Sequence, residues 1–226
     1  MKFYVVATPI GNLEDITLRA LRVLKEVDYI LCEDTRVTKK LLSAYDIHTP
    51  TLSYHAHSKL SKVDFIIDLV REGKNLALVS DAGTPGISDP GSALVVELRD
   101  KVPDLKIEVI PGASALVAAY SIAGINSSDF TFFGFLPHKK GRETLFKEIA
   151  ASKRTSIFYE SPHRILKTLE SLKNHLTLGR NVVICRELTK IFEEVIRGTP
   201  DEILIYFDEH KEKVRGEFVV IVVSEE

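Results

Sequence analysis

Short apolar runs alternate with amphipathic stretches along the first half of the chain. The runs are rich in β-branched and aromatic side chains and predict strands at residues 3–8, 29–32, 51–54, 76–79 and 106–110. Between them, apolar residues recur every three or four positions, as in Leu18, Leu21 and Leu24, which is typical of helices with one buried face. Asp15 or Thr17 is expected to cap the first of these helices. Strands that alternate with helices predict a parallel sheet with right-handed crossovers.

The second half of the chain shows a similar alternation, which becomes less regular towards its end. Apolar runs predict strands at residues 130–135, 155–159, 181–185, 194–197 and 218–223. The later strands follow one another with few helices between them, which indicates a mixed sheet. Thr199, with Pro200 next to it and Glu202 three positions on, is typical of the start of a helix. A polar break at residues 124–129 separates the halves, and we expect two α/β domains, 1–112 and 113–226.

The composition is that of an ordinary globular protein. Apolar residues make up 45% of the chain and charged residues 27%, and no apolar run approaches the length of a membrane span. Cys32 and Cys185 each lie inside a strand-like run, so we expect buried free thiols in a reducing, cytoplasmic compartment. The net charge of −2 gives no overall nucleic-acid footprint, so any role with RNA has to depend on local basic patches.

The connection at residues 80–91 joins a predicted strand to a predicted helix and carries three glycines and two prolines. Glycine allows backbone to approach a ligand closely, and loops at the carboxyl ends of parallel strands build ligand sites. The length and composition of this loop therefore predict a binding site, the alternative being a long surface turn that binds nothing. The fingerprints of dinucleotide-binding and phosphate-binding loops are absent from the sequence, which argues against a nicotinamide or ATP enzyme.

Three further groups of residues carry candidate chemistry, and each has an ordinary structural alternative. His55 and His57 lie on one face of an extended segment, but zinc needs three or four ligands, so we expect no metal. Asp34 and Arg36 follow a strand, where they either serve a ligand site or cap a helix. The basic loop at residues 138–142 either contacts RNA phosphates or is a solvated surface loop that binds nothing. No activated serine or cysteine signature is present, which favours direct transfer between two bound ligands.

Several motifs follow one another along the whole chain in a fixed order. They are Thr8-Pro9-Ile10-Gly11-Asn12-Leu13, Glu33-Asp34-Thr35-Arg36, residues 80–91, Pro111-Gly112-Ala113-Ser114-Ala115 and Phe158-Tyr159-Glu160-Ser161-Pro162-His163-Arg164. This series resembles the motifs of the tetrapyrrole (corrin/porphyrin) methylase family, in particular its branch that acts on ribosomal RNA. Porphyrin-acting members carry Gly-Asp-Pro where this chain has Gly83-Thr84-Pro85, which weakens a tetrapyrrole interpretation.

The resemblance implies an enzyme that uses S-adenosyl-L-methionine to methylate the ribose 2′-hydroxyl of a cytidine in 16S rRNA, near the decoding centre of the small ribosomal subunit. It also implies a tetrapyrrole-methylase-like α/β fold, with a parallel-sheet domain, a mixed-sheet domain and the cofactor in a cleft between them. A homodimer is the usual assembly in the family. Two alternatives stay open: a small-molecule methyltransferase of the tetrapyrrole or diphthine type, and a non-catalytic RNA-binding module.

The expected site residues lie in the turns that follow strands. We expect the cofactor to contact Thr8, Pro9, Ile10, Gly11, Gly83, Thr84, Pro85, Gly86, Ile87, Asp89, Ser114, Ala115, Tyr159 and Glu160. RNA contacts are expected from Arg36, Lys139, Lys140, Arg142, His163 and Arg164.

The proton acceptor is expected among Glu160, His55 and Asp34. A carboxylate in a water-poor site becomes a better base unless an arginine holds it ionised, as Arg36 would do for Asp34. His55 needs no shift, because the ordinary pKa of histidine is about 6.5.

Overall fold

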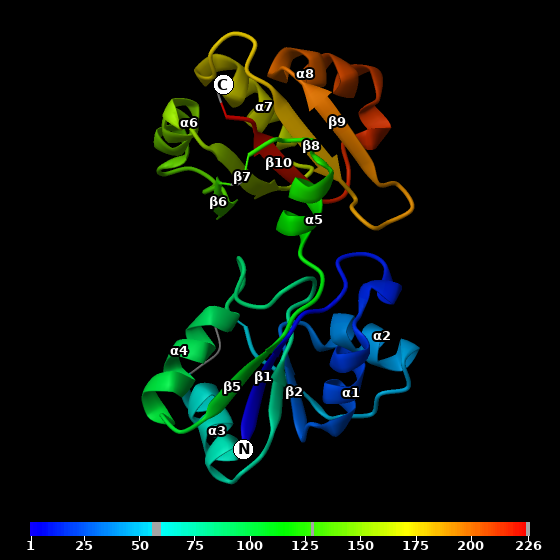
Figure 1. Cartoon of the computed structure of the whole chain (residues 1–226), viewed down its shortest axis with the longest axis vertical. Helices are drawn as coiled ribbons and strands as arrows, with labels where there is room; N and C mark the ends of the chain where they lie inside the picture. Colours follow the sequence, from blue (N-terminus) through cyan, green and yellow to red (C-terminus); the bar gives the residue numbers. More distant parts are fainter. Residues whose placement is uncertain (56–59, 128, 225–226) are drawn as a thin grey trace. The chain divides into compact units, whose positions relative to one another are not determined.

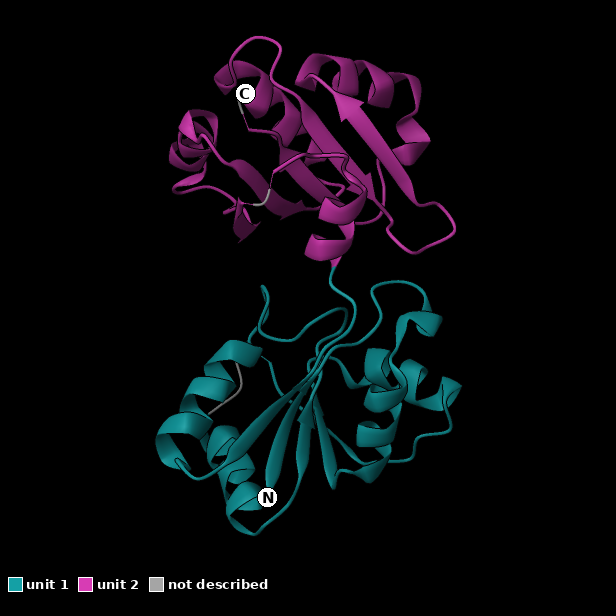
Figure 2. Cartoon of the chain, viewed as in Figure 1, with its two compact units in different colours: residues 1–114 teal, residues 115–226 magenta. Residues whose placement is uncertain are grey.

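The computed structural model describes residues 1–55, 60–127 and 129–224. The chain divides into two compact units, residues 1–114 and residues 115–226, shown in separate colours in Figure 2. The expected domain boundary, between residues 112 and 113, lies close to this division. Within the described residues, no helix is long and apolar enough to span a membrane.

Unit 1 is built on a five-stranded parallel sheet with the strand order β3-β2-β4-β1-β5. Its strands are β1 (Lys2–Val6), β2 (Tyr29–Cys32), β3 (Thr51–Ser53), β4 (Leu76–Leu78) and β5 (Lys106–Ile110). Its α-helices are α1 (Leu18–Glu26), α2 (Thr35–Ala44), α3 (Leu60–Arg71) and α4 (Gly91–Lys101). The predicted parallel sheet is confirmed. The predicted first strand is too long at its end, because Thr8 leaves the ladder and bonds to Gly83 instead.

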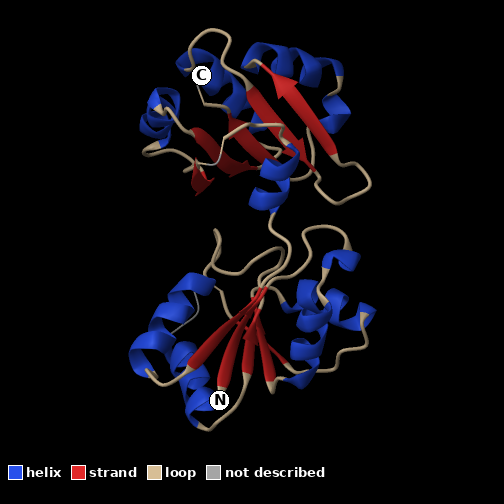
Figure 3. Ribbon diagram, viewed as in Figure 1, coloured by secondary structure: helices blue, strands red, loops and turns tan. Residues whose placement is uncertain are grey.

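Helices cover both faces of this sheet, as Figures 1 and 3 show. Ala20, Leu24 and Leu41, on α1 and α2, pack in a core cluster on one face, and Ile66 and Leu94, on α3 and α4, pack in a cluster on the other. Burial of apolar side chains on both faces explains why the sequences of these strands are continuous apolar runs. A parallel sheet covered in this way exposes only its edges, so its ligand-binding edge is the one where the strands end.

The ends of two helices follow the expected chemistry. Thr17, one of the two expected caps, accepts a hydrogen bond on Oγ1 from the Ala20 nitrogen, 3.1 Å away. Asp15 instead ends the short 3₁₀ helix η1 (Leu13–Asp15). Gly73 follows α3 with φ of +86°, the left-handed conformation that glycine adopts without strain.

Unit 2 contains a mixed five-stranded sheet with the order β6-β7-β10-β8-β9. Only the pair β6–β7 is parallel, which confirms the predicted mixed sheet. Its strands are β6 (Phe130–Phe135), β7 (Thr155–Glu160), β8 (Val182–Arg186), β9 (Glu194–Gly198) and β10 (Phe218–Val222). Its helices are α5 (Ala115–Ile122), α6 (Arg142–Ala151), α7 (Ile165–His175), α8 (Pro200–Glu209) and the short 3₁₀ helix η2 (Lys211–Lys213).

The main core of unit 2 lies between the sheet and helices α6, α7 and α8, where Phe146, Leu169 and Phe207 pack against Phe158 and Val220. Along β7, side chains alternate between the two faces, so the neighbour of Phe158 on the strand, Tyr159, lies on the face away from this core. On that second face, Tyr159 contacts aromatic rings of β6.

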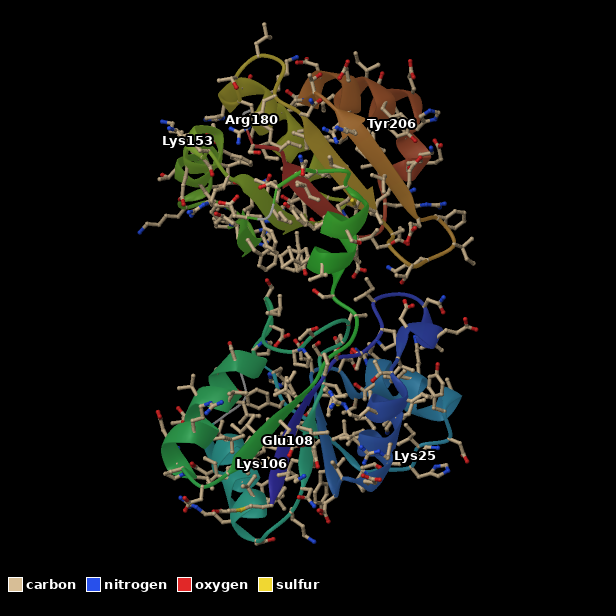
Figure 4. All side chains as sticks on the ribbon, viewed as in Figure 1. Lys25, Lys106, Glu108, Lys153, Arg180 and Tyr206 are labelled. Carbon is tan, nitrogen blue, oxygen red and sulfur yellow. The ribbon has the colours of Figure 1, made fainter. Side chains whose placement is uncertain are left out.

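Polar side chains form hydrogen bonds with the backbone at the ends of two helices of unit 2. The capping box predicted at the start of α8 is confirmed, since Thr199 and Glu202 bond reciprocally. The guanidinium of Arg180, labelled in Figure 4, donates hydrogen bonds to the carbonyls of Ala150, Ser152 and Val223 at 2.7–3.0 Å. The carbonyls at the end of α6 thus accept hydrogen bonds from Arg180, which no pattern in the sequence predicted.

Candidate functional site

Three loops meet at the edge of unit 1 where the strands end. Thr8 and Gly83 exchange two backbone hydrogen bonds, of 2.9 and 3.1 Å, which join the loop after β1 to the loop after β4. Thr84 donates through Oγ1 to the carbonyl of Ala113 at 3.0 Å, which joins the second loop to the one after β5. The structure therefore brings together three of the expected cofactor-binding segments.

The residues of the first loop divide into those that hold it and those that lie outward. The Thr8 side chain is buried and donates to the Ser80 carbonyl at 3.2 Å. Ile10 is buried against Gly83, where a Cβ would lie 3.4 Å from the Ile10 side chain. Pro9 is partly buried, whereas Gly11 is exposed. Thr8 and Ile10 thus shape the edge, and the backbone around Gly11 is the part open to a ligand.

The second loop is held in a conformation that ordinary residues avoid. Gly83, Gly86 and Ser88 have φ of +83°, +87° and +67°. Asp89 accepts hydrogen bonds from the backbone nitrogens of Gly86, at 2.8 Å, and Gly91, at 2.7 Å. Positive φ is costly at a serine and is found where surrounding contacts impose it, often at ligand sites. Asp89 therefore shapes the loop from inside.

The other members of this loop differ in exposure. Pro85 is buried, Thr84 is partly buried and Ile87 is exposed. At the end of the third loop, Ser114 is the last residue of unit 1 and Ala115 is the first residue of α5 in unit 2.

Acidic side chains gather where β2 and β4 end. Asp34 is the N-cap of α2, and its carboxylate binds the Arg36 guanidinium at 2.6 Å. Hydrogen bonds from the Arg36 side chain lower the pKa of Asp34 to about 2. Asp81 accepts a hydrogen bond from the Asp34 backbone nitrogen at 3.0 Å, which links the two strand ends. Asp34 and Arg36 therefore adopt the capping arrangement that the sequence left open.

Glu33, which sequence reasoning did not single out, lies beside these groups. Burial raises the pKa of its carboxyl, and the negative charges of Asp81 and Asp89 raise it further. A carboxyl group whose pKa is raised by burial and by neighbouring negative charge is a candidate for proton transfer. The position of Glu33 directly after β2 is the feature of the sequence that could have identified it as a candidate.

His55 follows β3 and is exposed. Its expected neighbour His57 lies outside the described residues. Across residues 1–55, 60–127 and 129–224, no three His, Cys, Asp or Glu side chains form a group that could hold a metal ion. Cys32 and Cys185 are both buried and free, as expected, and burial raises the pKa of the Cys185 thiol to about 12.

In unit 2, Glu160 lies at the centre of a buried ion-pair network. Its side chain is 0% exposed and contacts Arg164 at 2.7 Å and Arg142 at 3.1 Å. Thr168 donates to it through Oγ1 at 2.6 Å, and the Ser161 backbone nitrogen donates at 2.8 Å. Each carboxylate oxygen thus has two partners within the protein, so the network favours a structural role for Glu160 over proton transfer.

Two of the arginines expected to contact RNA belong to the same network. Arg142 and Arg164 point inward to Glu160, and the Arg142 guanidinium also lies 5.0 Å from the centre of the Phe146 ring. The other four expected RNA-binding side chains are exposed, namely Arg36, Lys139, Lys140 and His163. Tyr159 is partly buried between aromatic rings, and burial raises the pKa of its hydroxyl.

A parallel sheet with glycine-bearing loops tied together at its carboxyl edge, followed by a mixed-sheet unit, defines an α/β protein built to bind a ligand. The sequence pattern of the tetrapyrrole (corrin/porphyrin) methylases matches residues 2–204, and the chain belongs to this family. The expected family and α/β fold class are thereby confirmed.

Relatives with high identity cover nearly the whole chain. Ribosomal RNA small subunit methyltransferase I of Halalkalibacterium halodurans is 50% identical over 221 residues, which are 97% of this chain and 74% of that protein. The protein of the same name from Thermotoga maritima is 44% identical over 225 residues, which are 100% of this chain and 99% of that protein. A solved uroporphyrin-III-C-methyltransferase from Thermus thermophilus has a TM-score of 0.69 at 19% identity, over 98% of this chain and 94% of that one, and shows the fold alone.

Proposed function

We propose that this chain is an S-adenosyl-L-methionine-dependent methyltransferase that acts on the ribose 2′-hydroxyl of a cytidine in 16S rRNA, near the decoding centre of the small ribosomal subunit. The observation that carries the proposal is the identity of 44% and 50% to two proteins named as small-subunit rRNA methyltransferases, over nearly all of this chain. The Gly83-Thr84-Pro85 sequence agrees with a substrate other than a porphyrin.

Two features of the carboxyl edge of unit 1 support the proposal that the cofactor binds there. The backbone of residues 83–89 takes positive φ at three positions, and two of these are glycines, which have no side chain to keep a ligand from the backbone. Glu33, Asp34 and Asp81 lie around the same edge, and carboxyl groups complement the positive charge of a sulfonium. We propose that Gly11, Gly86, Ile87 and Ser114 contact the cofactor directly, while Thr8, Ile10 and Asp89 hold the loops that bind it.

When bound, the cofactor supplies an activated methyl group. The protein then has to align the acceptor oxygen, exclude water and take up one proton. Asp34 is poorly suited to take up that proton, because Arg36 holds its pKa at about 2. Both carboxylate oxygens of Glu160 are already engaged by four donors, Arg142, Arg164, Thr168 and the Ser161 nitrogen, which favours a structural role. The proton acceptors that we propose are therefore His55 and Glu33.

Contacts with RNA phosphate are proposed for the four exposed basic residues, Arg36, Lys139, Lys140 and His163. Such contacts position a nucleic acid without reading its sequence. We further propose that the protein acts as a homodimer in the cytoplasm, where its ribosomal substrate is made.

Three measurements test the proposal. Calorimetry with S-adenosylmethionine should show binding to the wild-type protein, whereas a non-catalytic RNA-binding module would bind none. Radiolabelled methyl transfer should then go to 30S subunits and not to uroporphyrinogen III, and the reverse preference would identify a small-molecule enzyme. Mapping of the labelled nucleotide as a 2′-O-methylcytidine completes the test, since a label on a base would contradict it.

The proton acceptor is tested separately, by single-turnover methylation with cofactor and 30S subunits saturating. Glu33→Gln or His55→Asn should lower the rate about 10²- to 10⁴-fold if the residue takes up the proton, with little change in either affinity. Near-normal rates in both variants would exclude both residues.

A further inference from the structure

Strand β6 carries an irregularity that places two aromatic rings on one face of the sheet. Phe132 pairs with Ile157 of β7 and Phe135 pairs with Tyr159, so two residues of β6 stand opposite one residue of β7. Gly134, inside this bulge, has φ of +64°. Because side chains alternate along a regular strand, Phe132 and Phe135 would otherwise lie on opposite faces. The bulge lets both rings contact Tyr159. The ring centroids of Phe132 and Phe135 lie 5.1 and 5.3 Å from the ring centroid of Tyr159.

Phe135 is 57% exposed although it belongs to this aromatic group. It lies at the end of β6, an edge strand of the sheet. An edge-to-face partner such as Tyr159 supports one side of the ring and leaves ring surface open to solvent. The exposed ring is thus held in place, with its outer surface available for stacking.

The chain directly after Phe135 is fixed from the protein side. Leu136 is buried, and its carbonyl accepts a hydrogen bond from Arg164 at 3.0 Å. The carbonyl of Pro137 accepts one from Arg142 at 3.2 Å. Both arginines are bound to Glu160, so the buried network anchors the end of β6 and the start of the basic loop.

Beyond this anchor, the chain continues into a basic run that begins three residues after Phe135. His138, Lys139 and Lys140 are consecutive and exposed, and the turn closes through a 3.2 Å hydrogen bond from the Arg142 nitrogen to the Lys139 carbonyl. An exposed aromatic ring followed four and five residues later by exposed lysines matches what single-stranded nucleic acid offers, a flat base and a charged phosphate.

We propose that Phe135 is a stacking platform for one unpaired base of the RNA substrate, with Lys139 and Lys140 holding the neighbouring phosphates. The proposal rests on the proposed rRNA methylation and assigns a substrate-binding surface to it. Specific recognition of RNA commonly uses bases that are splayed out of the helix and stacked on aromatic side chains. Stacking on Phe135 would hold the substrate strand in a fixed register while the phosphates bind the lysines.

The test compares Phe135→Ala with Phe192→Ala, because both rings are 57% exposed and both belong to unit 2. The probe is a fluorescein-labelled single-stranded RNA, with its duplex form as a second probe. Phe135→Ala should weaken binding of the single strand about 5- to 100-fold, and Phe135→Tyr should restore it. Phe192→Ala should bind as wild type, and the duplex should be insensitive to both. Thermal melts of each variant verify that unit 2 is folded.

Abasic substitutions identify the stacked base. At one position of the single strand, removal of the base should weaken binding to the wild type and have no further effect on Phe135→Ala. The double change Lys139→Glu and Lys140→Glu should reduce the dependence of affinity on salt. Lys153 is an exposed lysine of the same unit and is labelled in Figure 4. Lys153→Glu should leave the dependence of affinity on salt unchanged.

Three outcomes would overturn the platform. Equal affinities of Phe135→Ala and Phe192→Ala for the single strand would show that the ring contributes nothing specific. A lower affinity of Phe135→Ala for S-adenosylmethionine would assign the ring to the cofactor. A changed sedimentation coefficient would assign it to an interface between two copies. Absence of methyl transfer by the wild-type protein contradicts the proposed function instead, and leaves the RNA-binding comparison to decide on the platform.

Discussion

Both carboxylate oxygens of Asp89 lie 2.8 Å from the backbone nitrogen of Gly86. One of them also accepts a hydrogen bond from the Gly91 nitrogen at 2.7 Å. A side chain that binds backbone on both sides of itself closes the turn between β4 and α4. The shape of the candidate cofactor loop therefore depends on Asp89, although the carboxylate is turned towards its own loop.

Removal of this carboxylate should weaken cofactor binding without any loss of a direct contact. Asp89→Ala leaves two backbone nitrogens unpaired, and hydrogen bonds to a charged acceptor are worth about 1.5–3 kcal/mol each. We expect the affinity for S-adenosylmethionine to fall about 10- to 100-fold in calorimetry. Asp100→Ala, an exposed carboxylate on α4, is the control and should bind as wild type. Wild-type affinity of Asp89→Ala would show that the loop keeps its shape unaided.

Gly86 and Gly73 provide a matched pair for separating backbone strain from binding. Their φ angles are +87° and +86°, and a Cβ at either position meets no atom closer than 3.8 Å. Gly86→Ala and Gly73→Ala should therefore each cost about 1–2 kcal/mol of stability, from strain alone. Only Gly86→Ala should also weaken the binding of S-adenosylmethionine. Equal cofactor affinities in the two variants would place Gly86 outside the site.

The sequence predicted the elements well because most of them are governed by local rules. Apolar periodicity located the strands and helices, and the side chains of Thr17 and Thr199 marked helix starts, since a cap needs only neighbours in sequence. It also identified the loop at residues 80–91, whose glycines were visible and whose positive φ angles were implied. The family resemblance, which the relatives confirm, added the functional class.

The sequence could not predict which charged groups turn inward. Arg142 follows Lys139 and Lys140 in one basic run, yet it alone is the first residue of α6 and reaches Glu160 at the end of β7. That pairing depends on how α6 packs over the sheet, which is tertiary information. The bulge at Gly134 was equally hidden, because it is defined by the register of β6 against its neighbour.

Asp34 should titrate far below the usual range for a carboxyl group. Its pKa is about 2 because Arg36 donates hydrogen bonds to it, against about 3.9 for an ordinary aspartate. A lowered pKa means that Asp34 stabilises the fold above about pH 4 and that this stabilisation is lost as the pH falls towards 2. Carboxyl NMR should show the low value in the wild type and a higher value in Arg36→Ala, still below 3.9 because the backbone nitrogens of residues 36 and 37 continue to donate to the carboxylate. A pKa near 3.9 in the wild type would mean that the pair is not formed in solution.

Substitution of Glu160 tests whether this residue acts as a base or as a positioning residue. Glu160→Gln keeps the shape of the side chain but leaves Arg142 and Arg164 without a carboxylate, which should cost about 3–5 kcal/mol of stability. Since these arginines bind the carbonyls of Pro137 and Leu136, the end of β6 should loosen as well.

The kinetic consequence of Glu160→Gln should therefore appear in substrate binding. At a temperature where the variant is folded, the KM for 30S subunits should rise, while the single-turnover rate at saturating substrate stays within a few-fold of wild type. Glu143→Gln, an exposed glutamate on α6, controls for the loss of one negative charge and should leave both values unchanged. A base has the opposite signature, in which the saturated rate falls about 10²- to 10⁴-fold and affinity persists. That result in Glu160→Gln would return Glu160 to the chemistry and would require its arginine partners to release it when substrate binds.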